Sequence, residues 1–305
     1  MRKSTHGTVA PQTTGTSRTN SGAFVFLLFF LIGAGILFYP KISAWLAEYN
    51  QVVAIQTYQA QVSDLSSDEK EAMWNKAVDY NERMTHSIVK DPFAVTENID
   101  PFDEYFDTLD VGAGIMGVIY IPAIGVRLPI YHSTSDAVLA LGVGHIKATA
   151  LPIGGPSTHS VLTAHTGLRN ANMFNDLVNL VEGDTFYIEV LDRTHAYQVD
   201  HIEVVQPDDI SKLKVVESKD YITLVTCTPY GVNSHRLLVR GERVDYDADA
   251  SIEMARRPFP WWVLIVILIL VLIIDRIALW LDRRAKRRRD ELASSSRKDG
   301  TDDQR

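Results

Sequence analysis

Two stretches of the chain are apolar at almost every position. Residues 24–39 read FVFLLFFLIGAGILFY and residues 258–274 read PFPWWVLIVILILVLII, and neither contains a charged residue. Each is close to the shortest length that spans hydrocarbon, so the pattern predicts a signal anchor or transmembrane helix at residues 23–40 and a transmembrane helix at residues 258–281. A cleaved signal peptide is the alternative for the first, although Ile42 to Ala44 is a weak cleavage site. We expect an uncleaved anchor.

The pattern between the two apolar stretches changes twice. Apolar residues at intervals of three and four, with Ser66 and Glu69 as a capping box, predict extracellular helices over residues 41–90. The periodicity fails over residues 91–114, where prolines and acidic residues predict a long loop. From residue 115 to 250 the chain has short β-branched or aromatic runs separated by turn residues, which predict strands. The runs cover residues 117–132, 159–165, 184–190, 196–205, 221–227 and 235–244.

Such a series of short strands predicts an all-β fold, which we expect to be a closed barrel of about eight strands. A short helix is expected at residues 171–180, ANMFNDLVNL. The architecture is completed by the helical and loop segments before the barrel and by a transmembrane helix at each end.

The charges predict the orientation of the chain. The N-terminal flank, residues 1–22, carries basic residues and no acid and is expected to be disordered. The tail, residues 282–305, begins with DRRAKRRR, so the positive-inside rule places both ends in the cytoplasm and the domain between the spans outside. Residues 41–256 contain 31 acidic and 16 basic residues, a net charge of −15. Such a surface disfavours nucleic acid and favours cationic partners.

Cys227 is the only cysteine of the chain. It cannot form an internal disulfide. Outside the cytoplasm it therefore forms an intermolecular disulfide, is a buried thiol without a chemical role, or is a reactive group. Pro229 cannot continue a central strand, which predicts that the thiol lies at a rim of the sheet. The sequence has no paired-cysteine or HExxH metal motif and no phosphate-binding loop, so we expect no metal and no cofactor.

A nucleophilic thiol needs a proton donor and a positive group for the oxyanion. His165 ends the run HSVLTAH in the same strand-then-turn position that Cys227 has. Arg236 and Arg240 point to the same face of one strand but lie about 13 Å apart at roughly 3.3 Å per residue. Only one of them can serve the thiol. From composition alone, a buried thiol and a hydrogen-bonded core histidine explain these residues equally well.

The motifs TLVTC, HRLLVRG and LTAHTGL resemble those of the sortases, the cysteine transpeptidases of Gram-positive cell surfaces, from about Tyr80 to Val244. IMGVIYIP, LPIYH, GVGHIKATALPIGG and TPYGVN resemble the class C, pilin-polymerising branch. The resemblance implies that Cys227 is the nucleophile, His165 the acid and base, and Arg236, rather than Arg240, the oxyanion or positioning group. It implies cleavage of an LPXTG-like motif between Thr and Gly and transfer of the acyl group to a pilin lysine.

Class C sortases also have a lid loop in which Asp-Pro is followed by an aromatic residue. This chain has two such sequences, one with Asp91 and Phe93 and one with Asp100 and Phe102. The first is preferred because it follows DYNERM at about the distance found in the family. Both could instead be ordinary acidic turns.

Other functions compatible with the sequence are anchoring of proteins to peptidoglycan, simple cysteine peptidase activity, and a non-catalytic membrane-tethered barrel that binds pilin or cell wall. The chain could also be a substrate that is sorted, but no LPXTG-like pentapeptide precedes residue 258. The predicted partners are therefore pilin subunits with a sorting signal and an acceptor lysine, together with the lipid bilayer.

Overall fold

The computed structural model describes residues 21–85, 104–112, 114–167 and 173–246, and single positions between residues 268 and 289. The chain divides into two compact units, Met1–Ser251 and Ile252–Arg305. The described positions of the second unit are helical. Most of the predicted span at residues 258–281 lies outside the described residues.

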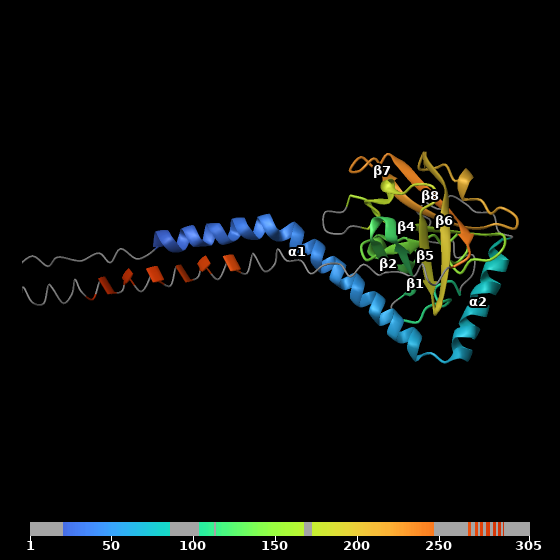
Figure 1. The fold of residues 1–305 in the computed structure, drawn as a ribbon, viewed down its shortest axis with the longest axis horizontal. Coiled ribbons are helices and arrows are strands. Elements are labelled where there is room, and N and C mark those ends of the chain that lie inside the picture. The colour runs from blue at the N-terminus through green and yellow to red at the C-terminus, as the bar shows by residue number, and fades with distance from the viewer. Residues whose placement is uncertain are drawn as a thin grey trace, which may run out of the picture. The chain divides into compact units, whose positions relative to one another are not determined.

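The first unit contains a closed barrel of eight strands in the order β1-β2-β3-β4-β7-β8-β6-β5, which confirms the predicted all-β barrel (Figure 1). Neighbouring strands are antiparallel except for two parallel pairs, β2 with β3 and β4 with β7. The strands are β1 Ile115–Ile121, β2 Val126–His132, β3 Val143–His145, β4 Thr158–Thr163, β5 Thr185–Val190, β6 Arg193–Val205, β7 Asp220–Thr228 and β8 His235–Val244.

The strand predictions hold with two exceptions at the barrel wall. The run at residues 117–132 forms two strands, because the 3-10 turn η1 (Pro122–Ile124) ends at Gly125, whose φ of 60° suits glycine. β3 was not predicted, because a strand of three residues is too short for an alternating apolar and polar pattern to be recognised. The short helix α3 (Asp136–Leu139), capped by the Ser135 side chain, precedes β3.

The predicted helix at residues 171–180 is wrong over its described part. Residues 173–176 form turns, and only the 3-10 turn η2 (Leu177–Asn179) is helical. The reason is visible at Asn175, whose side-chain oxygen accepts hydrogen bonds from the Gly167 amide at 2.8 Å and the Thr166 hydroxyl at 3.2 Å. Short polar side chains that bond to backbone compete with a helix.

Two helices precede the barrel, as the periodicity predicted. α1 (Ser21–Asp64) is continuous through Pro40, so no helix end separates the predicted anchor from the extracellular helical part. α2 (Ser67–Thr85) begins with the predicted capping box, in which the Ser66 amide donates to Glu69 at 2.8 Å and the Glu69 amide to Ser66 Oγ at 3.3 Å. Among the described residues, one helix, Phe29–Asp64, is long and apolar enough to cross a membrane.

Both helices are fixed to the barrel by buried residues. The Tyr58 hydroxyl of α1 donates to the Met116 carbonyl at 3.3 Å and accepts from the Leu191 amide at 2.7 Å, and burial raises its pKa. Asn81 of α2 bonds to both the amide and the carbonyl of Leu151, at 2.7 and 3.1 Å. Each bond satisfies a buried backbone group that would otherwise cost about 1–3 kcal/mol.

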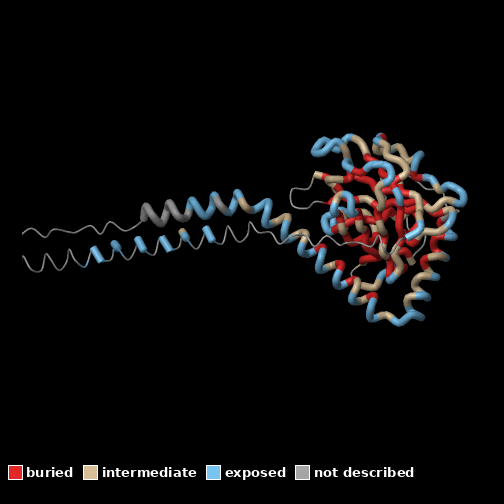
Figure 2. The backbone as a smooth tube through the Cα atoms, viewed as in Figure 1, coloured by how far each residue is buried: buried red, intermediate tan, exposed pale blue. Residues whose placement is uncertain are grey.

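The buried residues form two separate apolar clusters, and the larger one fills the barrel and extends beneath α1 and α2 (Figure 2). The smaller one, which we call the outer cluster, lies on the outside of the wall formed by β4, β7, β8 and β6. The 3-10 turn η3 (Ser211–Leu213), in the connection between β6 and β7, covers it. Its members are Ile146, Val161, Val205, Leu213, Val225 and Leu238.

Candidate active site at the ends of β4, β7 and β8

Cys227 is half-buried and is the last but one residue of β7. Successive side chains of a strand point to opposite faces. On β7, Ile222 and Leu224 belong to the barrel interior, whereas Val225 belongs to the outer cluster. Cys227 therefore shares the outer face with Val225. The strand ends one residue later, so the thiol lies at the rim, as predicted from Pro229.

Arg236 lies beside Cys227 on the neighbouring strand. β7 and β8 are antiparallel, and their register pairs Cys227 directly with Arg236. Directly opposed residues have Cβ atoms about 4.5–5.5 Å apart and point to the same face. The Arg236 Nη1 atom also donates to the carbonyls of Asn233 at 3.4 Å and His235 at 3.2 Å, which hold the guanidinium near the turn between the two strands.

His165 reaches the same level from the other side of β7. β4 runs parallel to β7 with Thr163 opposite Val225, and continuing this register by two residues brings His165 level with Cys227. The Ala164 amide still bonds to the Val225 carbonyl at 3.3 Å, so the pairing continues past the end of β4. His165 is half-buried, and its ring has no hydrogen-bond partner within the described part of the chain.

Two further bonds fix the backbone at His165, and neither could be found from sequence. The buried Thr226 hydroxyl donates to the Ala164 carbonyl at 2.9 Å, so the residue before the thiol holds the residue before the histidine. The Phe174 amide donates to the His165 carbonyl at 3.1 Å. No sequence pattern marks these bonds, because both connect segments that meet only in the folded barrel.

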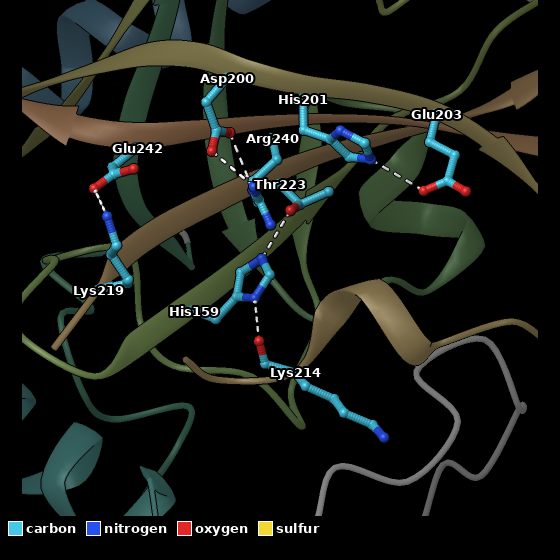
Figure 3. Close-up of polar contacts among 9 residues, drawn as sticks. All are labelled: His159, Asp200, His201, Glu203, Lys214, Lys219, Thr223, Arg240 and Glu242. Atoms are coloured by element: carbon cyan, nitrogen blue, oxygen red, sulfur yellow. Dashed lines mark hydrogen bonds and ion pairs between the residues drawn. The ribbon is translucent and has the colours of Figure 1, made fainter. Parts of the chain in front are cut away.

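Arg240, the other candidate arginine, has different partners on the same outer face. Its Nε and Nη2 atoms donate to the two carboxylate oxygens of Asp200 at 3.0 and 2.7 Å (Figure 3). Its guanidinium also lies 4.2 Å from the centroid of the Tyr221 ring. These hydrogen bonds raise the pKa of Arg240. Its register partner on β7 is Thr223, four residues before Cys227. Arg240 thus stabilises the wall away from the thiol.

His159 completes this network one strand away (Figure 3). Its Nδ1 lies 2.9 Å from the Lys214 carbonyl, which can only accept, so Nδ1 carries the proton and Nε2 accepts from the Thr223 hydroxyl at 2.7 Å. Desolvation lowers the pKa of His159 to about 4, so the ring is neutral at pH 7. The bond to Lys214 holds the connection between β6 and β7 against the outer face.

The four lid residues, Asp91, Phe93, Asp100 and Phe102, lie outside the described residues. The described end of the predicted loop is packed rather than open: Tyr105 is fully buried, and its hydroxyl donates to His145 Nδ1 at 2.9 Å. Burial lowers the pKa of His145 to about 3. Among the described residues, no group of three or more His, Cys, Asp or Glu could hold a metal ion.

The fold and site together define a closed β-barrel that carries a thiol, an imidazole and a guanidinium on three adjacent strand ends. A Sortase domain model matches residues 119–244. The structure is similar to sortase C1 from Streptococcus agalactiae, with 45% identity, a TM-score of 0.60 and coverage of 64% of this chain and 99% of that one. It is also similar to sortase C-1 from Actinomyces oris, with 45% identity, a TM-score of 0.56 and coverage of 59% and 99%.

The chain belongs to the sortase family of cysteine transpeptidases, and class C sortases are among its structural neighbours. A curated relative, Sortase A of Bacillus anthracis, is 31% identical over 132 residues, which is 43% of this chain and 60% of that protein. The match therefore spans less than two thirds of the length of this curated relative.

Proposed function

We propose that this protein is a transpeptidase that cleaves an LPXTG-like motif between Thr and Gly and transfers the acyl group to a lysine of a pilin subunit. The observation that carries the proposal is the register of β4, β7 and β8, which brings His165, Cys227 and Arg236 to the same level on one face. Arg240 does not compete for this role, because Asp200 and Tyr221 engage it.

In the first half-reaction, the Cys227 thiolate attacks the Thr carbonyl carbon, and the oxyanion forms beside Arg236. Protonated His165 gives its proton to the Gly nitrogen, the C–N bond breaks, and the Thr carbonyl remains on sulfur as a thioester. A positive group near a thiol favours the thiolate, which Arg236 and protonated His165 provide. An oxyanion donor of this kind is worth about 3–4 kcal/mol.

In the second half-reaction, a neutral lysine amine attacks the thioester. The now neutral His165 takes a proton from the attacking nitrogen, the C–S bond breaks, and the thiolate returns with an isopeptide bond as the product. The acidic extracellular domain attracts a cationic acceptor over a short range. One structural relative has the name "Sortase C1 of GBS Pilus Island 1", which supports a pilin acceptor.

The membrane topology belongs to the same proposal. Residues 23–40 anchor the chain, residues 41–250 form the extracellular helices, lid segment and barrel, and residues 258–281 cross the membrane again before the basic cytoplasmic tail at residues 282–305. The apolar helix α1 supports the first span. The second span rests on the sequence alone, as does a lid in which Asp91 meets Arg236 and Phe93 covers Cys227, with Asp100 and Phe102 as the alternative.

The test uses the full-length protein in nanodiscs, an LPXTG-type peptide library, a lysine-bearing peptide and a peptidoglycan stem peptide. Mass spectrometry should show a thioacyl adduct on Cys227, cleavage between Thr and Gly, and ligation to the lysine peptide. Cys227→Ala should abolish all three. Exclusive use of the stem peptide would overturn the pilin acceptor, exclusive use of water would make the protein a peptidase, and unchanged activity in Cys227→Ala would overturn the proposed chemistry.

A further inference from the structure

α1 has an apolar stripe that no described residue covers. Six large apolar side chains on this helix after Pro40 are exposed: Ile42, Trp45, Leu46, Tyr49, Val52 and Val53. At 3.6 residues per turn, these positions fall within about one third of the helix circumference. The Trp45 and Tyr49 rings stack on each other with centroids 6.0 Å apart. We call these six residues the apolar stripe.

The apolar stripe lies on the side of α1 that faces away from the barrel. The barrel-facing side contains Gln51, Ile55 and Tyr58, which are all buried. The stripe also has a defined end. Beyond Val53, the next positions on its side of the helix are Gln56 and Ala60, which are exposed but are not large and apolar. A stripe that stops where the helix docks on the barrel is not part of the protein core.

Length connects the apolar stripe with the membrane span. Residues 24–39 form about 24 Å of helix at 1.5 Å per residue, which is short of the roughly 30 Å of hydrocarbon. Extending the apolar surface to Trp45 supplies the missing length. Trp and Tyr are the residues that favour the headgroup level of a bilayer, and an apolar face bordered by exposed polar residues such as Asn50 is typical of a helix at the interface.

We propose that the apolar stripe lies in the interface of the outer leaflet, with Trp45 and Tyr49 at the headgroups, and holds the barrel directly against the membrane surface. The occupant of the stripe is therefore lipid. Its continuity with the apolar helix supports this choice. The chain's own C-terminal segment suits the stripe less well, because residues 247–260 contain five charged residues and two prolines. The proposal rests on the proposed anchor, but not on the proposed chemistry.

The side of α1 opposite the stripe contacts the segment that holds the His165 backbone. Gln51, on the barrel-facing side of α1, donates from Nε2 to the Met173 sulfur at 3.5 Å. Phe174, the next residue, donates its amide to the His165 carbonyl. A barrel fixed in this way would meet substrates that are themselves held at the membrane surface.

The solitary thiol makes a direct test possible. In the full-length Cys227→Ala protein, which has no cysteine, single substitutions Leu46→Cys, Tyr49→Cys and Val53→Cys would carry a nitroxide label in vesicles of phosphatidylcholine and phosphatidylglycerol. Asn50→Cys and Thr57→Cys are matched controls on the same helix, and Leu31→Cys is the reference for the span. Electron paramagnetic resonance would measure collision with oxygen, which concentrates in lipid, and with a water-soluble nickel complex.

The expected ratio of oxygen to nickel accessibility is several-fold higher at the three stripe positions than at residues 50 and 57, and highest at residue 31. A high ratio at residue 31 with aqueous values along the stripe would overturn the interface while leaving the anchor intact. Aqueous values at all positions would overturn both. Spin–spin broadening at the stripe would show a second copy there, and a stripe that is inaccessible to both reagents until residues 252–305 are deleted would show that this segment is the occupant.

A second measurement uses the native side chain. Brominated lipids quench tryptophan according to depth, and the difference between the full-length protein and Trp45→Phe isolates the contribution of Trp45. Quenching of that contribution should be strongest with bromine near the headgroup. No quenching at any bromine depth would contradict the proposal.

Discussion

The outer face of β4, β7 and β8 has two ends that carry the same residue types. At the thiol end, His165 and Arg236 flank Cys227. At the other end, which we call the packed end, Arg240 lies opposite Thr223 and His159 lies opposite Tyr221. The partners differ. Arg240 is held by both oxygens of Asp200, and both ring nitrogens of His159 have a partner, whereas the His165 ring has none within the described chain.

This difference supports the proposal that one sheet uses a histidine and an arginine for two purposes. A charged or polar group with fixed partners stabilises a fold, because its hydrogen bonds are already made. A group that must hold a proton or an oxyanion during a reaction needs hydrogen-bonding capacity that contacts within the protein do not already use. The residue types are the same at both ends, so it is the difference in hydrogen-bond partners that supports different roles for them.

The largest effect should come from replacing each of the two arginines by alanine in turn. Arg236→Ala removes the proposed oxyanion group and should lower kcat/KM by two to three decades with little change in the thermal midpoint, because an oxyanion donor contributes about 3–4 kcal/mol. Arg240→Ala leaves a half-buried Asp200 without its partner and should destabilise the protein by about 1–3 kcal/mol with a nearly normal kcat/KM. Peptide-cleavage kinetics and differential scanning fluorimetry give the two readouts. If one variant had the larger loss of both kcat/KM and thermal midpoint, the two arginines would not differ in role as the comparison requires.

The packed end should also make stability depend on pH. The pKa of His159 is about 4 in the folded protein, well below its ordinary value of 6.5, so a proton binds more tightly to the unfolded chain. Stability should therefore fall as the pH drops from 6.5 towards 4, by about 2 kcal/mol at pH 5 for this one residue. Urea unfolding at pH 7.5 and pH 5 would show a smaller pH difference in His159→Gln. If the unfolding free energy changed equally between the two pH values in both proteins, His159 would be excluded as a source of the pH dependence.

A smaller effect is expected at Thr226, a positioning residue that connects the strand of the thiol to the backbone before His165. Thr226→Val removes the bond to Ala164 and should lower kcat about five- to tenfold with KM unchanged, because one hydrogen bond contributes about 1 kcal/mol. Thr226→Ser should restore most of the loss. Thr223→Val is the matched control, since it loses a bond at the packed end, and it should leave kcat unchanged. Similar kcat values for Thr226→Val and Thr223→Val would contradict the assignment.

The smallest effect concerns the lid that the sequence predicts for the thiol end. Asp91→Ala should speed alkylation of Cys227 by up to about fivefold, because a partly exposed ion pair contributes about 0.2–1 kcal/mol. Asp100→Ala is the matched comparison, and the variant with the faster labelling identifies the latch. Unchanged alkylation rates of Cys227 in both variants would contradict the proposed lid.

Local patterns predicted a large part of the molecule. Alternating runs predicted all barrel strands except β3, and the capping box marked the start of α2. The position of Pro229 predicted that Cys227 lies at a rim, and spacing alone showed that Arg236 and Arg240 cannot both serve one thiol. The helix at residues 171–180 failed because Asn175 bonds to the turn at Gly167, which is a contact that no periodic pattern contains.

The sequence by itself determined which residues could do chemistry and which elements carry them, because composition and period are local properties of the chain. Only the tertiary structure decided which of them meet and which partners they have. Parallel pairing of β4 with β7 brings residues 62 positions apart to one level, and Asp200 reaches Arg240 across the β6–β8 pair. Closure of the barrel sets these distances, and it is a property of the whole chain rather than of any segment.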